Sequence, residues 1–354
     1  MPLISIPARG DVLQAESGEN LLKVLRRNQI PVQYSCKRGE CGSCKCRLES
    51  GSVDMQGYRD AALPAAQRDA GLILACCSTI RDDITLGLVD SDDYIAHPQR
   101  RLVTVVRAVD TLTPEVSRLR LDIRYVDREG EPFVFSAGQY ARLSVQNAAG
   151  TWIARDFSMA GTPVDAEYDD RLEFHIRRTP AGAFSGLLGT VVVPGATVYV
   201  EGPMGSAHFR PRHEGPLLAV SAGTGLGPML SVVKTALLNG KIDEVTLYAG
   251  FRTAADVYAR ASMAELAREF NHFRYHIVVE EGAQGDDRPG RVGDAVLADR
   301  AAFDGVKVYV AGSPAMVESV SAALCARGLP ARDLHADAFY APAPETTGES
   351  RQGI

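Results

Sequence analysis

The sequence lacks any long hydrophobic run. No apolar stretch approaches the length of a transmembrane helix, and the first residues, MPLISIPARGDVLQAE, do not have the basic, apolar and small-residue regions of a signal peptide. A basic excess is also missing, because 38 Lys and Arg stand against 44 Asp and Glu, for a formal net charge of -6. We therefore expect a cytoplasmic protein with no nucleic acid and no membrane among its partners.

Low-complexity tracts are scarce as well. Hydrophobic residues make up 45% of the chain and charged residues 23%, which is the composition of an ordinary globular protein. At 354 residues the chain is too long for one hydrophobic core. We therefore expect two or three domains.

What the sequence does contain is a dense group of cysteines, in YSCKRGECGSCKC. Structural disulfides are rare in the cytoplasm, so this group indicates a metal site. Cys36, Cys41 and Cys44 are spaced C-x4-C-x2-C, and Cys76 and Cys77 follow later in GLILACCSTI. In plant-type [2Fe-2S] ferredoxins one loop with this spacing supplies three thiolates, and a distant strand supplies the fourth. Structural zinc normally needs a second compact ligand pair, which this sequence does not show.

Glycines lie between these cysteines. Bridging sulfides and thiolates carry negative charge, so a cluster loop has to wrap closely and point backbone N–H groups inward, and Gly39 and Gly42 permit this. Spacing alone leaves both Cys76 and Cys77 open as the fourth ligand. The remaining cysteines, Cys46 and Cys325, are expected to be small core hydrophobes.

The segments around the cysteines predict one small domain over residues 1–92. LISIP and DVLQA alternate as a hairpin does, ENLLKVLRRNQI has the apolar spacing of a helix, and KCRLE and DITLGLV add strands. This pattern suits the β-grasp fold of plant-type ferredoxins. The charged, proline-containing residues 93–100 are predicted to be a linker.

In the rest of the chain, a region rich in strands is followed by a region in which strands and helices alternate. Residues 101–212 contain strand segments separated by turns, which predict an antiparallel β-barrel or sandwich. Residues 213–340 alternate strand and helix, as a doubly wound parallel sheet requires. Residues 341–354 are rich in proline and polar side chains and are expected to form a flexible tail. The predicted fold class is therefore multi-domain, α+β and α/β.

A glycine-rich turn opens the alternating region. In GPLLAVSAGTGLGPMLSVV a buried-strand run passes through AGTGLGP into a helical run. Glycines at such a turn let the backbone approach a pyrophosphate at the positive end of a helix. The spacing differs from G-x-G-x-x-G, so the standard dinucleotide fingerprint is not the basis of this prediction.

Several of these stretches resemble a known family. YSCKRGECGSC together with LAC resembles the ferredoxin module of bacterial aromatic-oxygenase reductases. RDFSMAGTP and HIRRTPAGAFSGLL resemble the FAD-binding barrel of the ferredoxin-NADP reductase superfamily, and AGTGLGP and VYVAGSPAM resemble its nucleotide domain. Over nearly the whole chain, the order ferredoxin, flavin, nicotinamide is similar to that of NADH-dependent reductase components of aromatic-ring-hydroxylating oxygenases.

This resemblance implies a role for individual residues. It favours Cys76, directly after Leu-Ala, as the fourth ligand beside Cys36, Cys41 and Cys44. It implies that FAD is the flavin, with Ser158 and Phe157 as catalytic residues at the flavin ring and Arg155 as a clamp for the pyrophosphate. Other implied flavin contacts are His175, Ile176, Gly182, Ala183, Phe184, Ser185 and Phe339, and a helix is expected to begin at SGLL, directly after this glycine turn. The implied nucleotide contacts are Gly223, Thr224, Gly225, Gly227, Pro228, Arg252, Gly312 and Ser313.

The sequence departs from the family pattern at two positions. Phe157 replaces the usual Tyr, which keeps an aromatic ring and removes a hydroxyl donor. Ala311 stands where the family has a Cys, so no thiol is expected beside the nicotinamide. The strand end in YAGFRT offers Arg252 but no acidic residue for a ribose hydroxyl, so NADH is expected from the family alone and NADPH stays possible.

The function implied is conversion of paired electrons into single ones. A nicotinamide delivers two electrons as a hydride, flavin holds them, and a [2Fe-2S] cluster accepts one at a time. The expected acceptor is a Rieske ferredoxin or the terminal oxygenase of an aromatic-ring dioxygenase or monooxygenase system. Two alternatives are kept: the reductase of a di-iron hydroxylase, and a non-enzymatic zinc-binding interaction module.

A local basic excess suggests where the acceptor docks. The cysteine loop carries more cations than anions, although the chain as a whole is acidic. A solvated loop whose cations only offset the cluster charge is an equally good interpretation. The residues concerned are Lys37, Arg38, Lys45 and Arg47 against Glu40 and Glu49.

Overall fold

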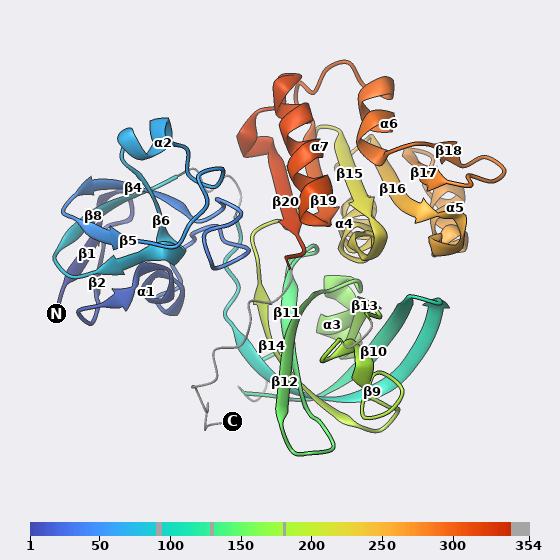
Figure 1. The fold of residues 1–354 in the computed structure, drawn as a ribbon, viewed down its shortest axis with the longest axis horizontal. Coiled ribbons are helices and arrows are strands. Elements are labelled where there is room, and N and C mark those ends of the chain that lie inside the picture. Colours follow the sequence, from blue (N-terminus) through green and yellow to red (C-terminus); the bar gives the residue numbers. More distant parts are fainter. Residues whose placement is uncertain (90–93, 128–130, 180–181, 341–354) are drawn as a thin grey trace.

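The strands of this protein form four sheets in three regions of the chain (Figure 1). The computed structural model describes all residues except 90–93, 128–130, 180–181 and 341–354, so the predicted tail lies outside the described residues. Within the described part, no helix is long and apolar enough to cross a membrane. The sheets confirm the predicted multi-domain α+β and α/β fold class.

The N-terminal region has a five-stranded sheet, in the order β2-β1-β8-β4-β6, and a three-stranded sheet, β3-β7-β5. The predicted hairpin is present, with Ile4 paired to Leu13, and β1 also pairs in parallel with β8. Helix α1 begins where the Asn20 side chain accepts a hydrogen bond from the Lys23 N–H, and it buries its apolar face in the core. The elements are β1 (Leu3–Ile6), β2 (Asp11–Gln14), β3 (Glu19–Asn20), α1 (Leu21–Arg27), β4 (Lys45–Ser50), β5 (Val53–Met55), α2 (Ala65–Asp69), β6 (Leu72–Leu74), β7 (Ser78–Ile80) and β8 (Ile84–Leu88).

The middle region is one antiparallel six-stranded sheet, in the order β12-β11-β14-β9-β10-β13. The sheet curls so that its two edge strands, β12 and β13, approach each other. At this closure Met159 forms a bridge with Phe174, and the Ala160 N–H donates to the Glu173 carbonyl at 2.8 Å. Alternate side chains fill the interior, as expected for a barrel. The elements are β9 (Arg100–Thr113), β10 (Val116–Val126), β11 (Tyr140–Gln146), β12 (Trp152–Ser158), α3 (Pro163–Asp169), β13 (Arg171–Arg177) and β14 (Thr197–Met204).

The C-terminal region is a parallel sheet in the order β18-β17-β16-β15-β19-β20. One core packs α4 and α5 against the sheet, and a second core packs α6 and α7, so helices cover both faces. The elements are β15 (Leu217–Ala222), α4 (Leu226–Asn239), β16 (Val245–Thr253), α5 (Arg260–Glu269), β17 (Phe273–Glu281), β18 (Arg288–Pro289), α6 (Val292–Asp299), β19 (Lys307–Gly312), α7 (Pro314–Ala326) and β20 (Leu334–Ala338).

Two stretches of chain connect the three regions. The described part of the predicted linker forms no helix or strand before β9, and the ring of Tyr94 lies 5.1 Å from that of His208 in the barrel region. No strand lies between Met204 and Leu217. The domain boundaries near residues 100 and 212 stay a prediction, and Figure 1 shows the three regions converging near the end of β20.

Candidate electron-transfer site

The cysteine loop between α1 and β4 wraps around its own sulfur atoms. The backbone N–H groups of Glu40 and Cys41 each donate to Cys36 Sγ at 3.3 Å, and the Cys36 N–H donates to Cys41 Sγ at 3.5 Å. Gly42 has φ 72°, and a Cβ on it would lie 2.6 Å from the Ala62 carbonyl oxygen. Glycine is therefore required here for both conformation and space.

A second sulfur pair joins this loop to the distant turn. The Cys76 N–H, in the 3-10 turn η2 (Ala75–Cys77), donates to Cys44 Sγ at 3.4 Å. The four predicted ligands thus lie as two pairs, Cys36 with Cys41 and Cys44 with Cys76, and each pair receives backbone N–H groups. Two cysteine pairs with inward donors fit a two-iron cluster.

The other three cysteines differ in their surroundings. Cys46 is completely buried, as predicted for a core residue, and burial raises the pKa of its thiol to about 12. Cys325 is exposed on α7, so the prediction that it is a core residue was wrong. Cys77 Sγ lies 3.6 Å from Cys76 Sγ and 3.8 Å from the Gly57 carbonyl oxygen, which keeps it next to the predicted ligands. The choice of Cys76 stays a prediction.

The predicted flavin residues lie together at the end of β12. Arg155 Nη1 donates to the Ala154 carbonyl at 2.7 Å, and the Phe157 ring lies 5.1 Å from that of Phe184. Because neighbouring residues of a strand face opposite ways, Ser158 points to the other face, where its hydroxyl donates to Asp337 Oδ2 at 2.9 Å.

The second predicted flavin segment forms a tight turn. The Ser185 hydroxyl accepts the Thr179 N–H at 3.2 Å, and the Gly186 N–H donates to the Gly182 carbonyl at 2.8 Å. A single 3-10 turn, η3 (Ser185–Leu187), follows in place of the longer helix expected from SGLL. The Phe184 side chain packs in the barrel core, and Ala183 precedes it in the turn.

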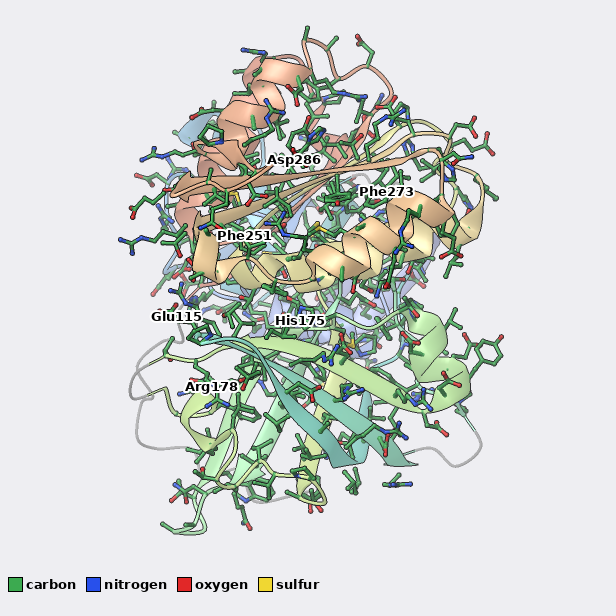
Figure 2. The ribbon with its side chains drawn as sticks, turned by 90° about the vertical axis from the view of Figure 1, so that its right-hand side faces the viewer. Glu115, His175, Arg178, Phe251, Phe273 and Asp286 are labelled. Carbon is green, nitrogen blue, oxygen red and sulfur yellow. The ribbon has the colours of Figure 1, made fainter. Side chains whose placement is uncertain are left out.

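His175 and Ile176 have different environments on β13. Figure 2 shows His175 at the edge of the barrel that faces the nucleotide region. Its Nε2 lies 3.1 Å from Glu173 Oε1, its ring packs edge-on against Tyr258 at 5.3 Å, and a Cβ on Gly227 would lie 3.2 Å from its Nδ1. Ile176 is buried in the barrel core.

The predicted nucleotide residues meet at the carboxyl edge of the parallel sheet. The 3-10 turn η4 (Gly223–Gly225), which contains Thr224, ends β15, and α4 carries Gly227 and Pro228 in its first turn. A Cβ on Gly225 would lie 2.1 Å from the Ala311 carbonyl oxygen at the end of β19, so only glycine allows this approach. The two motifs therefore flank the point where strand order reverses, the usual place for a ligand in such sheets.

Four further predicted residues extend this edge. The Ser313 hydroxyl accepts the Met316 N–H at the start of α7. The Phe339 N–H donates to the Gly312 carbonyl at 2.8 Å, which holds the chain after β20 against the end of β19. The sequence contains no acid at the end of β16, but the fold brings Glu281 of β17 to Arg252, with Oε1 3.9 Å from Nε.

The residues that join the three regions of the chain were not predicted from the sequence. Asp337 accepts hydrogen bonds from Ser158 and also from Ser35 of the cysteine loop, at 3.2 Å. Tyr140 of β11 donates its hydroxyl to the Ser35 carbonyl at 2.9 Å. The one sequence signal for Asp337 is the strand LHADA, where a buried strand carries polar residues at alternate positions.

Lys37 also takes part in this junction. Its φ is 61°, and its ammonium lies 2.9 Å from Met204 Sδ and 5.0 Å from the centre of the Tyr140 ring. Burial lowers the pKa of Lys37 to about 8, although Asp156 at 3.9 Å opposes this shift. Lys37 therefore faces the barrel, whereas the docking hypothesis had assumed that it faces solvent.

Comparison with known proteins places each region in a family. Residues 7–81 match the 2Fe-2S iron-sulfur cluster binding domain, residues 104–209 the oxidoreductase FAD-binding domain, and residues 219–322 the oxidoreductase NAD-binding domain. The cofactors are thus a [2Fe-2S] cluster, FAD and a nicotinamide nucleotide, and the zinc-module alternative is excluded.

The similarity to several known proteins extends over nearly the whole chain. The chain is 37% identical to the ferredoxin–NAD(P)+ reductase component of the naphthalene 1,2-dioxygenase/salicylate 5-hydroxylase systems of a Ralstonia species, over 93% of this chain and 95% of that protein. It is 29% identical to the phenol 2-monooxygenase reductase component of a Pseudomonas strain, over 99% and 98%. A solved cytochrome P450 reductase from Amycolatopsis shares 32% identity with a TM-score of 0.78, covering 96% of this chain and 99% of that one.

These matches define the class of the protein as an oxidoreductase that joins an iron–sulfur, a flavin and a nicotinamide domain. The chain belongs to the reductase components of aromatic dioxygenase and monooxygenase systems, and it passes electrons from NAD(P)H through FAD to a [2Fe-2S] cluster.

Proposed function

We propose that this reductase holds FAD through Arg155 and Ser158, holds its cluster through the two cysteine pairs, and delivers single electrons to a Rieske-type ferredoxin or a Rieske oxygenase. The observation that carries the proposal is the shared carboxyl of Asp337, which joins Ser158 of the flavin strand to Ser35 of the cysteine loop. One side chain therefore contacts both a predicted flavin residue and the residue that precedes a predicted cluster ligand.

The chain's own residues supply charge and positioning at each site. When bound, FAD accepts two electrons as a hydride and releases them one at a time, and a [2Fe-2S] cluster carries one. The Arg155 guanidinium offers a bidentate donor for a pyrophosphate. The turn at Gly223 and Gly225 offers backbone N–H groups ahead of α4 to a nucleotide phosphate. The N–H groups directed at Cys36 Sγ stabilise negative charge on sulfur.

The acceptor is a separate proposal. The Ralstonia and Pseudomonas putida relatives are named as ferredoxin–NAD(P)+ reductase components, which supports a ferredoxin as acceptor. Relatives named as phenol and propane monooxygenase reductase components support a di-iron hydroxylase as the second candidate. Cys76 and Cys77 line a surface hollow together with Arg38 and Arg81, so this side of the cluster site is open to an acceptor.

We further propose that NADH is preferred to NADPH. Glu281 beside Arg252 adds a carboxylate where the sequence alone offered only a cation. A carboxylate accepts a hydrogen bond from a ribose hydroxyl and repels a 2'-phosphate.

One set of measurements tests the function. Purified protein should absorb in the visible range as a flavin and an iron–sulfur cluster do, and NADH should bleach both under anaerobic conditions. The reduced protein should then pass electrons to a purified Rieske-type ferredoxin faster than to a di-iron hydroxylase. A colourless protein, or one that NADH does not bleach, would contradict the proposal, and faster reduction of the hydroxylase would favour the second acceptor.

A further inference from the structure

Asp337 carries a buried carboxyl group, which needs hydrogen-bond donors to offset its loss of hydration. It is 6% exposed on β20, with its side chain on the buried side of the strand. Burial raises the pKa of Asp337 to about 6, while the hydroxyls of Ser158 and Ser35 oppose that rise by donating to the charged form. A buried carboxylate without such donors would be costly. The two hydroxyls thus stabilise the buried carboxylate.

The two donors come from different regions of the chain. Ser158, at the end of strand β12, donates from Oγ to Asp337 Oδ2 at 2.9 Å. Ser35, in the cysteine loop, donates from Oγ to Asp337 Oδ1 at 3.2 Å. Each carboxylate oxygen therefore binds one hydroxyl. Because Asp337 itself belongs to the nucleotide region, one side chain ties all three regions together, which Figure 1 shows as the meeting of β20, the cysteine loop and the upper end of β11.

The cysteine loop is held at the same point by its backbone. The Tyr140 hydroxyl donates to the Ser35 carbonyl at 2.9 Å, and its buried ring packs with the core of the N-terminal region. Ser35 is thus fixed through its side chain by Asp337 and through its backbone by β11. Since Ser35 directly precedes Cys36, fixing Ser35 fixes the first predicted cluster ligand.

We propose that Asp337, Ser35 and Tyr140 are positioning residues for electron transfer from flavin to cluster. This inference rests on the proposed function, because it takes Ser158 as a flavin neighbour and Cys36 as a cluster ligand. Electron transfer through protein falls steeply with distance, so a junction held by buried hydrogen bonds sets the rate of this step more than it sets the rate of hydride transfer.

The step conserves electrons as follows. NADH loses a hydride and becomes NAD+, and FAD gains both electrons. In each following transfer one electron leaves reduced FAD and reduces one iron of the cluster from ferric to ferrous. The oxygenase-system acceptor removes that electron, so two transfers complete the oxidation of one NADH.

The test uses the full-length holoprotein with Ser35→Ala and Tyr140→Phe, each of which removes one hydroxyl of the junction. Ser35→Thr keeps the hydroxyl, and Ser50→Ala removes an exposed hydroxyl elsewhere in the same region. Each protein is mixed anaerobically with NADH in a stopped-flow instrument. Flavin bleaching reports hydride transfer, and freeze-quenched electron paramagnetic resonance reports the reduced cluster. Steady-state reduction of ferricyanide, taken as accepting electrons from the flavin, gives the KM for NADH.

Ser35→Ala and Tyr140→Phe should slow cluster reduction by about five- to tenfold, the population change expected when one buried hydrogen bond is lost. Flavin bleaching, ferricyanide reduction and the KM for NADH should stay within about twofold, and Ser35→Thr should restore the cluster rate relative to Ser35→Ala. Iron content and the shape of the cluster signal should not change, which a general loss of structure would not allow.

Unchanged cluster reduction in both variants, with full iron content, would overturn the inference and leave the proposed function standing. Equal slowing of flavin bleaching and cluster reduction would also overturn it, because the junction would then act on the flavin. If Ser35→Ala loses iron, Tyr140→Phe still decides, since it leaves the Ser35 side chain in place. Absence of NADH-driven bleaching in the unmodified protein would instead refute the proposed function, and the inference with it.

Discussion

Cys76 Sγ lies 3.6 Å from Cys77 Sγ at the edge of the cysteine site. One substitution at each position therefore separates the ligand from its neighbour. We expect Cys76→Ser to lose most of its iron, because [2Fe-2S] clusters of this type are held by four thiolates. Cys77→Ser should keep its iron. Iron and acid-labile sulfide per chain are the measurements.

Cys325→Ser is the control for these variants, since Cys325 is exposed on α7, outside the cysteine site. Retention of iron in the Cys76 variant and its loss in the Cys77 variant would reverse the assignment of the fourth ligand.

Arg155 is expected to contribute to flavin binding. Arg155→Ala should lower FAD occupancy, because a hydrogen bond to a charged group contributes roughly 1.5 to 3 kcal/mol, about ten- to a hundredfold in Kd. Flavin per chain after gel filtration measures occupancy, and chromatography of the heat-released flavin should identify FAD. Arg171→Ala, an exposed ion-paired arginine at the start of β13, is the matched control. FMN as the released flavin, or full occupancy in Arg155→Ala, would contradict the expectation.

Glu281 is expected to bias the choice of nucleotide. Replacing it by Gln removes a negative charge beside Arg252 without changing the size of the side chain, so a 2'-phosphate is no longer repelled there. We expect kcat/KM for NADPH to rise by about three- to tenfold, while that for NADH falls slightly, since both side chains are largely exposed and water screens the pair. Glu280→Gln is the neighbouring control. If the unmodified protein already prefers NADPH, the predicted preference is wrong.

Arg81 replaces Lys37 as the residue to test for acceptor docking, because Arg81 lines the hollow beside Cys76 and Cys77. Arg81→Ala should slow electron transfer to a ferredoxin acceptor by about two- to fivefold at low ionic strength and have little effect at high salt, where charges are screened. Arg124→Ala on the barrel is a matched control, since both arginines are exposed and lie 3.5 Å from an Asp. Equal salt dependence in the two variants would exclude this face as the docking surface.

Local patterns allowed most of the fold to be predicted. The hairpin of β1 and β2, helix α1 and the glycine turn after β15 all follow from spacing within short segments. Two local predictions were inaccurate for local reasons: SGLL forms only one 3-10 turn, and Cys325 falls on the exposed side of α7. In a helix as apolar as α7, sequence spacing does not identify the buried face.

The junction could not be predicted in the same way. Ser35 and Asp337 are 302 positions apart, and no local pattern pairs a serine before a cysteine with an acid in the last strand. Glu281 was missed for a similar reason, since it comes to Arg252 only when β16 and β17 pair in parallel. The orientation of Lys37 depends on a left-handed backbone conformation that the loop sequence does not require.

Ala311 has a practical consequence for chemical studies of this enzyme. It is completely buried at the end of β19, at the position where the family resemblance implied a cysteine. An alkylating reagent directed at a thiol beside the nicotinamide should therefore find no target at this position. Inactivation by such a reagent would report on the cysteines of the cluster site or on the exposed Cys325, and saturating NADH should give no protection against it.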